Sequence, residues 1–327
     1  MRLLRFGRFT AATLLGLSGC VSVYPAAEGS FQRTLEVTAP VSLEVTTGSG
    51  KIEVIAGSPG VVKVYAIVKA RDDRRAAGEE KLRRIQANPP IEQTGSMIRI
   101  GRTTEEIYRN VSISYEIQAP EETRLVTRSG SGSQRIEGLR DSVNAGTGSG
   151  TIAMFNIGGD VSAHTGSGSI QLDSVQGSID VRTGSGSVKA TNIAGSAKAT
   201  TGSGSISIAH AAEPTEFADT EAQTGSGRIN LSGVTGSLRA STGSGSIEAA
   251  GRPGSDWKIH TSSGSVTLVI PHDVPFDLNA RTGSGGIDVD HPVTLKGALS
   301  RNQLTGKVRG GGMLVAVQSG SGSISIR

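Results

Sequence analysis

The sequence is poor in the residues that build a conventional globular core. Aromatic residues make up 3% of its 327 positions, and it contains one tryptophan and one cysteine. Large rings supply much of the apolar area that ordinary cores bury, so a core of that kind is not expected. With a single cysteine the chain also has no internal disulfide, the device that stabilises many secreted domains.

Glycine, in contrast, is abundant, with 46 residues, and much of it recurs in the motif Thr-Gly-Ser-Gly-Ser followed by a β-branched residue. Gly-Ser runs are typical of flexible linkers, but a linker has no need of an apolar residue at a fixed offset. The motif begins at Ser129, Thr147, Thr165, Thr183, Thr201, Thr224, Thr242, Thr261, Thr282 and Ser319. Five of the intervals are 18 residues, and a fixed period of this size indicates stacked supersecondary units.

Each repeat contains two short alternating segments, such as Ile170-Gln171-Leu172 and Ile179-Asp180-Val181, separated by turns. This alternation is typical of β-strands. The sequence therefore predicts an all-β fold, a parallel β-solenoid of about 18-residue coils stacked ~4.8 Å apart. We expect a thin interior in which large aliphatic side chains face alanines, namely Ala145, Ala163, Ala199, Ala222, Ala240 and Ala280.

The motif itself is interpreted as the corner of each coil. We expect its glycines to adopt conformations with positive φ and its Ser and Thr hydroxyls to hydrogen-bond along the rod. The chain ends on a repeat strand, residues 323–327, with no polar cap after it. Because exposed strand edges invite pairing, the sequence predicts end-to-end self-association as one way the rods find partners.

Residues 31–126 keep strand alternation but lose the period, and they are predicted to form a β-rich capping region before the solenoid of residues 127–327. The expected strands are 35–37, 43–45, 52–55, 61–68, 98–100 and 111–117. The one expected helix lies within Arg71 to Asn88 and ends before Pro89-Pro90. An isolated copy of the motif stands at Thr47 to Gly50.

The first residues are typical of a secretory signal. Three arginines precede an apolar run, residues 9–17, that is too short to span a bilayer. Leu17-Ser18-Gly19-Cys20 resembles the lipobox of bacterial lipoproteins, which implies a signal peptide over residues 1–19, a lipidated Cys20 and a tether over residues 20–30. The resemblance further implies an outer-membrane lipoprotein, because Val21 is not the retaining aspartate. The alternative is an ordinary cleaved signal with an incidental cysteine.

Charge and motifs exclude several kinds of function. Without the signal peptide the chain has 30 basic and 29 acidic residues, so nucleic acid is not an expected partner. No cofactor motif, phosphate loop or G-x-S-x-G elbow is present. The five histidines, His164, His210, His260, His272 and His291, show no close pair at metal-ligand spacing, and we predict isolated surface histidines and no metal site.

Catalysis by a β-solenoid would need carboxylates or bases gathered on adjacent coils. The outward positions instead alternate in charge, as on a solvated face, so no catalytic residues are assigned. The residue before each motif is polar and never acidic. The candidate binding residues in this column are Arg128, His164, Arg182, Gln223, His260 and Arg281. They suit an anionic glycan or phospholipid headgroup; the alternative is a tolerant corner position. Aromatic platforms for sugar stacking are nearly absent, apart from Trp257 and a few tyrosines in residues 31–126.

Three features together resemble a known family of bacterial envelope proteins, the "putative adhesin" family of unknown function. They are the irregular β-rich start with one helix, the stretch Tyr115 to Pro120, and the recurring motif up to residues 319–326. The resemblance covers residues 31–327 and implies an envelope role without assigning chemistry. The leading hypothesis is a non-enzymatic, lipid-anchored adhesin or binding module for a surface glycan, cell-wall or protein ligand. A self-associating scaffold is the alternative, and a polysaccharide-active enzyme is a third.

Overall fold

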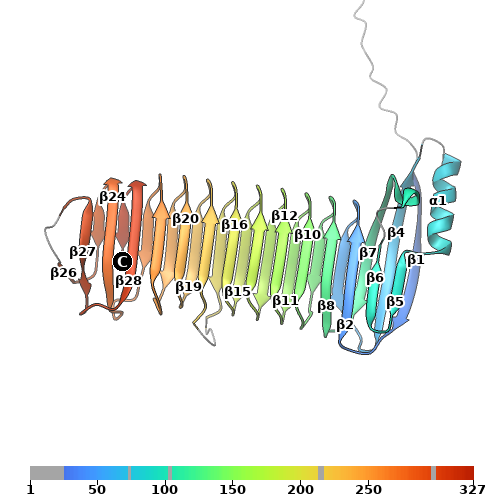
Figure 1. Cartoon of the computed structure of the whole chain (residues 1–327), viewed down its shortest axis with the longest axis horizontal. Helices are drawn as coiled ribbons and strands as arrows, with labels where there is room; N and C mark the ends of the chain where they lie inside the picture. The colour runs from blue at the N-terminus through green and yellow to red at the C-terminus, as the bar shows by residue number, and fades with distance from the viewer. Residues whose placement is uncertain (1–25, 73–74, 102–104, 213–216, 296–299) are drawn as a thin grey trace, which may run out of the picture.

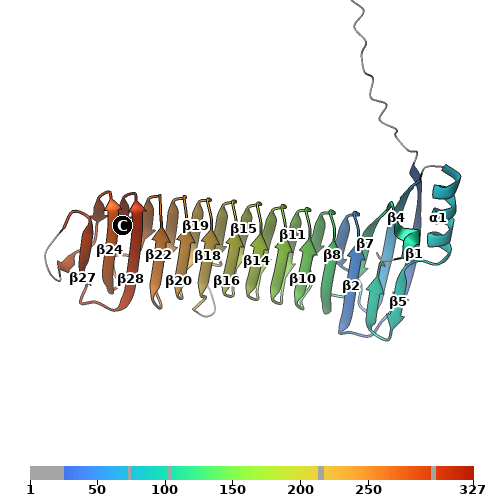
Figure 2. The same ribbon diagram turned by 45° about the horizontal axis from the view of Figure 1, so that its top comes forward.

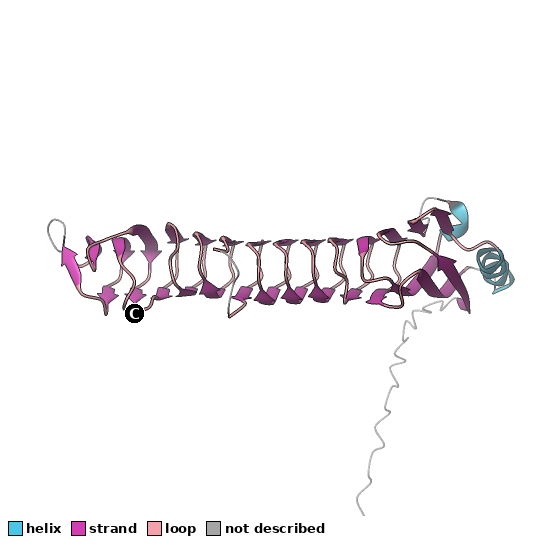
Figure 3. Cartoon of the chain, turned by 90° about the horizontal axis from the view of Figure 1, so that it is seen from below, coloured by secondary structure: helices cyan, strands magenta, loops and turns pink. Residues whose placement is uncertain are grey.

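Two long β-sheets face each other along a rod in the computed structural model of this chain (Figures 1 and 3). The structure describes residues 26–72, 75–101, 105–212, 217–295 and 300–327. The predicted signal peptide, Cys20 and the first part of the tether therefore lie outside the described residues. Strand alternation in the sequence becomes alternation of buried and exposed side chains, so each sheet turns its apolar face to the other.

We name the sheets by their place around the motif. The leading sheet contains the strands that end in the first residue of each motif, and the trailing sheet contains those that follow it. In spatial order along the rod, the parallel leading strands are β2 (Val41–Thr47), β8 (Thr123–Ser129), β10 (Val143–Thr147), β12 (Val161–Thr165), β14 (Ile179–Thr183), β16 (Ala197–Thr201), β18 (Thr220–Thr224), β20 (Leu238–Thr242), β22 (Trp257–Thr261), β28 (Met313–Ser321) and β24 (Phe276–Ser284).

The trailing strands follow the same order. They are β3 (Ile52–Ala56), β9 (Gln134–Glu137), β11 (Ile152–Ile157), β13 (Ile170–Val175), β15 (Val188–Ile193), β17 (Ile206–His210), β19 (Ile229–Val234), β21 (Ile247–Gly251), β23 (Val266–Val269), β29 (Ile324–Ile326) and β25 (Ile287–Val289). One leading and one trailing strand make a coil, so the described residues form eleven coils that stack into a rod ~48 Å long. The prediction of an all-β parallel solenoid is confirmed.

The interior is as thin as the sequence predicted. The inward alanines of the leading sheet, such as Ala163 and Ala199, are at most 2% exposed, and they face fully buried Ile, Leu and Val side chains of the trailing sheet. Equivalent residues of successive coils pair in register, as Ile152, Ile170 and Val188 do. The core is therefore one continuous apolar column along the rod.

The reason predicted for the motif glycines is wrong. Positive φ angles occur at other glycines, whereas those of the motif do not adopt them. They are needed because consecutive corners nearly touch: a Cβ on Gly184 would lie 2.4 Å from the carbonyl oxygen of Gly166, and one on Gly186 would lie 1.9 Å from that of Gly168. Positive φ occurs instead at the opposite corner, at Gly138, Asn156, Ser174 and Asn192 in four successive coils and at Gly233 in the coil of β19.

The threonine that opens each motif is buried and joins two coils. The Oγ1 of Thr183 donates to the carbonyl oxygen of Gly168 in the preceding coil at 2.7 Å and accepts from the N–H of Gly186 at 3.1 Å. The same bond to the preceding coil recurs at Thr165, Thr201, Thr224 and Thr242. The predicted bonding of corner hydroxyls along the rod is confirmed for these threonines.

The region before the repeats forms the first coil and a cap. The isolated motif copy is a genuine corner, because β2 pairs with β8 and Thr47 lies opposite Ser129. The trailing sheet is extended by β7 (Val111–Ala119), β4 (Val61–Arg71) and β1 (Ala26–Glu36), and the leading sheet by β6 (Met97–Ile100) and β5 (Ile91–Thr94).

Two short helices complete this cap, and one boundary differs from the prediction. The helix α1 (Arg75–Ala87) packs on β1 and β4 at the end of the rod, and a short 3-10 helix, η1 (Glu106–Tyr108), precedes β7 (Figure 1). Strand β1 begins at Ala26, inside the segment that the sequence suggested as a tether, because residues 26–36 pair with β4 along their whole length.

The other end differs from the predicted bare edge. The last strands in sequence, β28 and β29, are inserted between the coil of β22–β23 and the coil of β24–β25 (Figure 2). A hairpin of β26 (Val293–Leu295) and β27 (Gln303–Val308) then closes the leading sheet against β24. Because β29 is paired on both sides, the chain does not end on an unpaired repeat strand.

Candidate binding face

The outward face of the leading sheet carries two columns of side chains. The motif column holds the residue before each motif, and the outer column holds the residue two positions earlier. The register places the motif column in this spatial order: Arg128, Gly146, His164, Arg182, Thr200, Gln223, Ser241, His260, Gln318, Arg281. The structure thus brings the six candidate residues onto one line, with Gln318 placed before Arg281 because β28 is inserted.

In the N-terminal half of this face, the cations are neutralised by neighbouring acids. Arg128 forms an ion pair with Glu44 of the first coil, and Arg182 bonds Asp180 on its own strand at 2.7 Å. The ring of His164 lies over Gly146, where a Cβ would come within 2.5 Å of it. This half of the motif column therefore offers little free charge to a ligand.

Three cations of the C-terminal half lie outside the ion pairs that the described residues form. Arg239 on β20, Lys258 on β22 and Arg281 on β24 form no ion pair within the part of the chain that the structure describes. His260 lies beside Lys258 on the same strand, and all four side chains are exposed. The acid at this edge, Glu221, is already bound to Lys198 at 3.0 Å.

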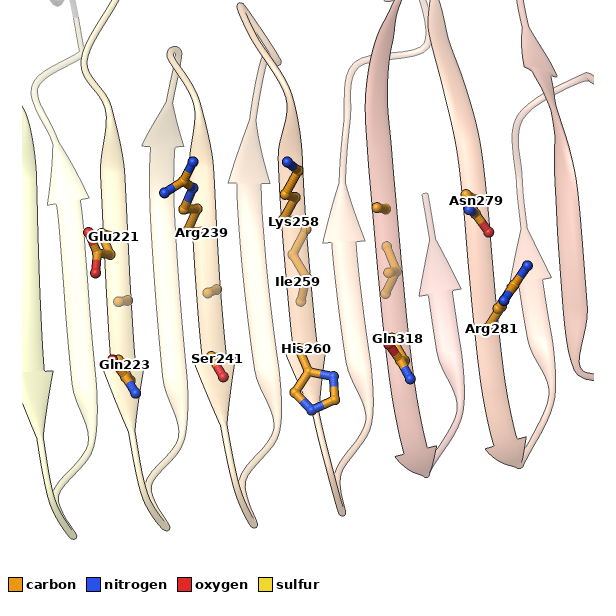
Figure 4. A pocket seen from close by; sticks show the side chains of 14 residues that line it. Glu221, Gln223, Arg239, Ser241, Lys258, Ile259, His260, Asn279, Arg281 and Gln318 are labelled. Atoms are coloured by element: carbon orange, nitrogen blue, oxygen red, sulfur yellow. The ribbon is translucent and has the colours of Figure 1, made fainter.

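These side chains surround a hollow of about 480 Å³ that spans β18, β20, β22, β28 and β24 (Figure 4). Its depth has a simple cause, since short side chains alternate with long ones across the sheet. Ala316 lies in the outer column between Lys258 and Asn279, and Ser241 lies in the motif column between Gln223 and His260. The hollow thus has a floor of small residues and a rim of cations and amides, with Glu221 at one edge.

The local electrostatics agree with this distribution of charge. Hydrogen bonds from the Ser237 side chain and backbone lower the pKa of Asp219 below its usual value, and the positive charge of Arg239 lowers it further. On the opposite side of the rod, the outward face of the trailing sheet carries Glu248 and Asp288 at this end. The two faces of the C-terminal half therefore differ in charge, and the leading face is the basic one.

Two of the aromatic residues suggested as sugar platforms are buried, whereas Tyr65 on β4 is 39% exposed. Trp257 is fully buried, and its indole N–H donates to the carbonyl oxygen of Gly236 at 3.1 Å. Tyr115 is 1% exposed. Neither ring is available for stacking, so recognition at this face relies on charge and hydrogen bonds.

Two of the five histidines are not on the surface, contrary to the prediction. His210 is buried in place of an aliphatic core residue, opposite Ile193, and burial lowers its pKa. His291 is also buried, and its ring centroid is 4.8 Å from that of His272. No group of three or more metal-ligating side chains occurs among the described residues.

Two carboxylates on the leading face are bound to cations. Asp180 and Glu221 are paired with Arg182 and Lys198 at 2.7 and 3.0 Å. On the trailing face, Glu53 bonds Lys51. A general acid and base need carboxyl groups free to exchange protons with a substrate, and these carboxylates serve neighbouring cations instead.

Among the described residues, no helix has both the length and the apolar character that crossing a membrane requires.

Comparison with solved structures gave matches of low identity, among them the following three. A putative cell adhesion protein from Clostridium sporogenes is 12% identical, with 92% of this chain and 99% of that chain covered and a TM-score of 0.27. A putative lipid binding protein from Parabacteroides distasonis is 13% identical, with 91% and 96% covered and a TM-score of 0.32. A putative adhesin from Bacteroides fragilis is 8% identical, with 91% and 97% covered and a TM-score of 0.30. Matches of this quality carry no argument about function.

The comparison with curated proteins found no match. The model of the Toastrack DUF4097 family, in contrast, matches residues 41–327, which include every repeat and most of the cap. The family relationship expected from the motif and the β-rich start is thereby confirmed. The chain belongs to the Toastrack DUF4097 family.

Proposed function

We propose that this protein is a non-enzymatic binding protein of the bacterial cell envelope. In this proposal Cys20 carries a lipid that anchors the chain to the outer membrane, and the rod presents the C-terminal half of its leading face to a polyanion. The observation that carries the proposal is the set of cations Arg239, Lys258 and Arg281, which surround a hollow and form no ion pair among the described residues.

The spacing of the cations favours a polymer over a small anion. They lie on β20, β22 and β24, and β28 separates the last two strands. Since adjacent strands are ~4.8 Å apart, the cations extend over ~14 Å along the rod. A single phosphate or carboxylate cannot contact all three, whereas an acidic polysaccharide lying along the rod can. The amides of Gln223, Gln318 and Asn279 offer hydrogen bonds to its hydroxyl groups.

The test compares two triple variants that remove the same charge. The chain from residue 20 onward is titrated with polygalacturonate, with dextran as the neutral probe. R239Q/K258Q/R281Q is expected to weaken binding at least tenfold, and the wild-type affinity is expected to fall as salt rises. The control K63Q/K189Q/R228Q removes three exposed cations of the trailing face and is expected to change the affinity less than threefold. Equal effects of the two variants, or equal binding of dextran, would contradict the proposal.

The scaffold alternative predicts association of rods end to end. The hairpin β26–β27 covers the end of the leading sheet, and the edge of the trailing sheet is β25, a strand of three residues that carries the exposed Asp288. Short, charged edges oppose pairing, so we expect a monomer. Sedimentation velocity over a hundredfold concentration range tests this, and growth of the species with concentration would favour the scaffold.

The side of the outer membrane on which the rod lies is a separate question. Antibody access to a C-terminal tag on intact cells, compared with permeabilised cells, answers it. Labelling of intact cells supports adhesion to an external glycan. Labelling only after permeabilisation would end the adhesin hypothesis and leave a periplasmic ligand for the same face.

A further inference from the structure

A pair of histidines, neither of which lines the basic hollow, closes over the end of the inserted coil. His272 follows β23, and His291 follows β25. These strands are not neighbours, since β29 lies between them. Their ring centroids are nevertheless 4.8 Å apart, with the planes tilted by 44°. The two turns thus meet across the terminus of β29.

The backbone around the pair holds this arrangement on both sides of the terminus. The N–H of Ile270, two residues before His272, donates to the carbonyl oxygen of Arg327 at 2.8 Å, and that of Asp290, next to His291, donates to Ile326 at 2.9 Å. The carbonyl oxygen of His272 also accepts from the Nε of Arg309. The histidines therefore stand on turns that are tied to the same last strand.

His291 is buried, and its packing leaves the hydrogen-bonding capacity of its ring nitrogens unused. It is 5% exposed, and its ring makes an edge contact with Phe276 at 5.5 Å. Neither Nδ1 nor Nε2 has a hydrogen-bond partner among the described residues. A buried polar group without a partner is costly and calls for an explanation, and a bound metal ion would satisfy one of these nitrogens.

We propose that His272 and His291 together bind a divalent transition-metal ion of the imidazole-preferring kind, such as Zn²⁺. Two imidazoles on one tetrahedral zinc ion have centroids about 5 Å apart, since each Zn–N bond is about 2.0–2.1 Å long. The observed separation matches this geometry. The exposure of His272 leaves one side open for water to complete the coordination. The nearby Asp273 is bound to Arg252 at 2.8 Å and is not counted as a ligand.

A metal at this position would act as a clasp. It would link the turn after β23 to the turn after β25, which lie on either side of β29. The inserted coil would then be held by a metal bridge as well as by its strand pairing. Hydrogen exchange at the amides of β29 and Arg327 should slow when the ion is present, because opening this end first requires release of the metal.

The test is a titration of the chain from residue 20 onward with Zn²⁺. The protein carries C20S, so that no free thiol binds metal, and no histidine tag. We expect one zinc ion per chain, and H272N or H291N should weaken binding at least tenfold. H260N, which changes an exposed histidine of the basic face, is the matched control and should leave the affinity unchanged.

Each outcome bears directly on the proposal. H272N alters an exposed side chain, so its folded state is expected to be intact even if H291N perturbs packing. Slowed exchange at β29 with zinc in wild-type protein, absent in H272N, supports the clasp. The proposal would be overturned if no saturable binding occurred up to about 1 mM Zn²⁺, or if H272N bound zinc as tightly as the wild type.

Discussion

Substitution of a motif glycine by alanine tests how the corners stack. In Gly184→Ala the new Cβ would lie 2.4 Å from the carbonyl oxygen of Gly166, and in Gly186→Ala it would lie 1.9 Å from that of Gly168. Both contacts are with backbone, so relief requires two coils to separate. Gly48 occupies the same motif position as Gly184, but it lies in the first coil and has nothing within 4 Å of its Cβ position. Gly48→Ala is therefore the matched control.

The expected magnitudes follow from two opposing effects. Replacing glycine reduces the entropy of the unfolded chain and stabilises by about 0.4–1 kcal/mol where the folded state accepts a Cβ. Overpacking against a rigid neighbour costs about 1–3 kcal/mol. For Gly186→Ala, separation of the coils also stretches the bond from Thr183 to Gly168, now 2.7 Å, which adds about 1 kcal/mol. We expect Gly48→Ala to be neutral or slightly stabilising, Gly184→Ala to lose about 1–2 kcal/mol, and Gly186→Ala to lose about 3 kcal/mol.

Urea unfolding followed by far-UV circular dichroism gives the order of the three variants. The reasoning requires Gly48→Ala to differ from the other two. If glycine were needed at the corner for its backbone freedom, all three variants would lose stability alike. Equal losses would therefore refute the steric account.

Two further predictions concern buried polar groups of the coils. Thr183→Val removes a hydroxyl that bonds Gly168 and Gly186 and should cost about 1–3 kcal/mol, whereas Thr200→Val on the partly exposed outward face should be neutral within about 0.5 kcal/mol; equal urea midpoints would contradict the corner bond. Burial lowers the pKa of His210 in the folded state. Its Nε2 hydrogen-bonds the Oγ1 of Thr220 at 2.8 Å, and its Nδ1 hydrogen-bonds the carbonyl oxygen of Ile193 at 3.2 Å. The unfolded chain therefore takes up the proton first as pH falls below about 6.5. Stability is full above that value and declines as pH falls toward the lowered pKa. His210→Gln should flatten this decline, and an unchanged slope between pH 7.5 and 5 would exclude His210 as its source.

Much of the rod was predictable because the spacing of the motif determines the register of its strands. An interval of 18 residues places equivalent residues opposite each other, as Val161 and Ile179 are. The line of candidate binding residues follows from the same spacing. The strand alternation likewise predicted the buried alanines, since a period of two assigns each residue to one face.

The role of the motif glycines was not predictable in the same way. Glycine is selected both by positive φ and by close approach of backbones, and the sequence alone does not distinguish these causes. The short distance between Gly186 and the carbonyl oxygen of Gly168 in the preceding coil shows that close approach is the cause. The free charge of Arg239 and Lys258 was missed for a related reason. In sequence they belong to a row of mixed charges, and only the register shows that Glu221 is already held by Lys198.

The order of the last coils could not be read from spacing, and it determines both candidate sites. The 37-residue interval before Ser319 predicts extra chain but not where the final coil is placed, since β28 pairs in the same register with β22 and with β24. Had the coils followed sequence order, Lys258 would lie beside Asn279, without the gap that Ala316 now leaves between them. His291 would likewise belong to a penultimate coil, and β29 would not lie between the two histidine-bearing turns. Inserting one coil thus creates the floor of the basic hollow on one side, and on the other it places β29 between the two turns from which His272 and His291 meet.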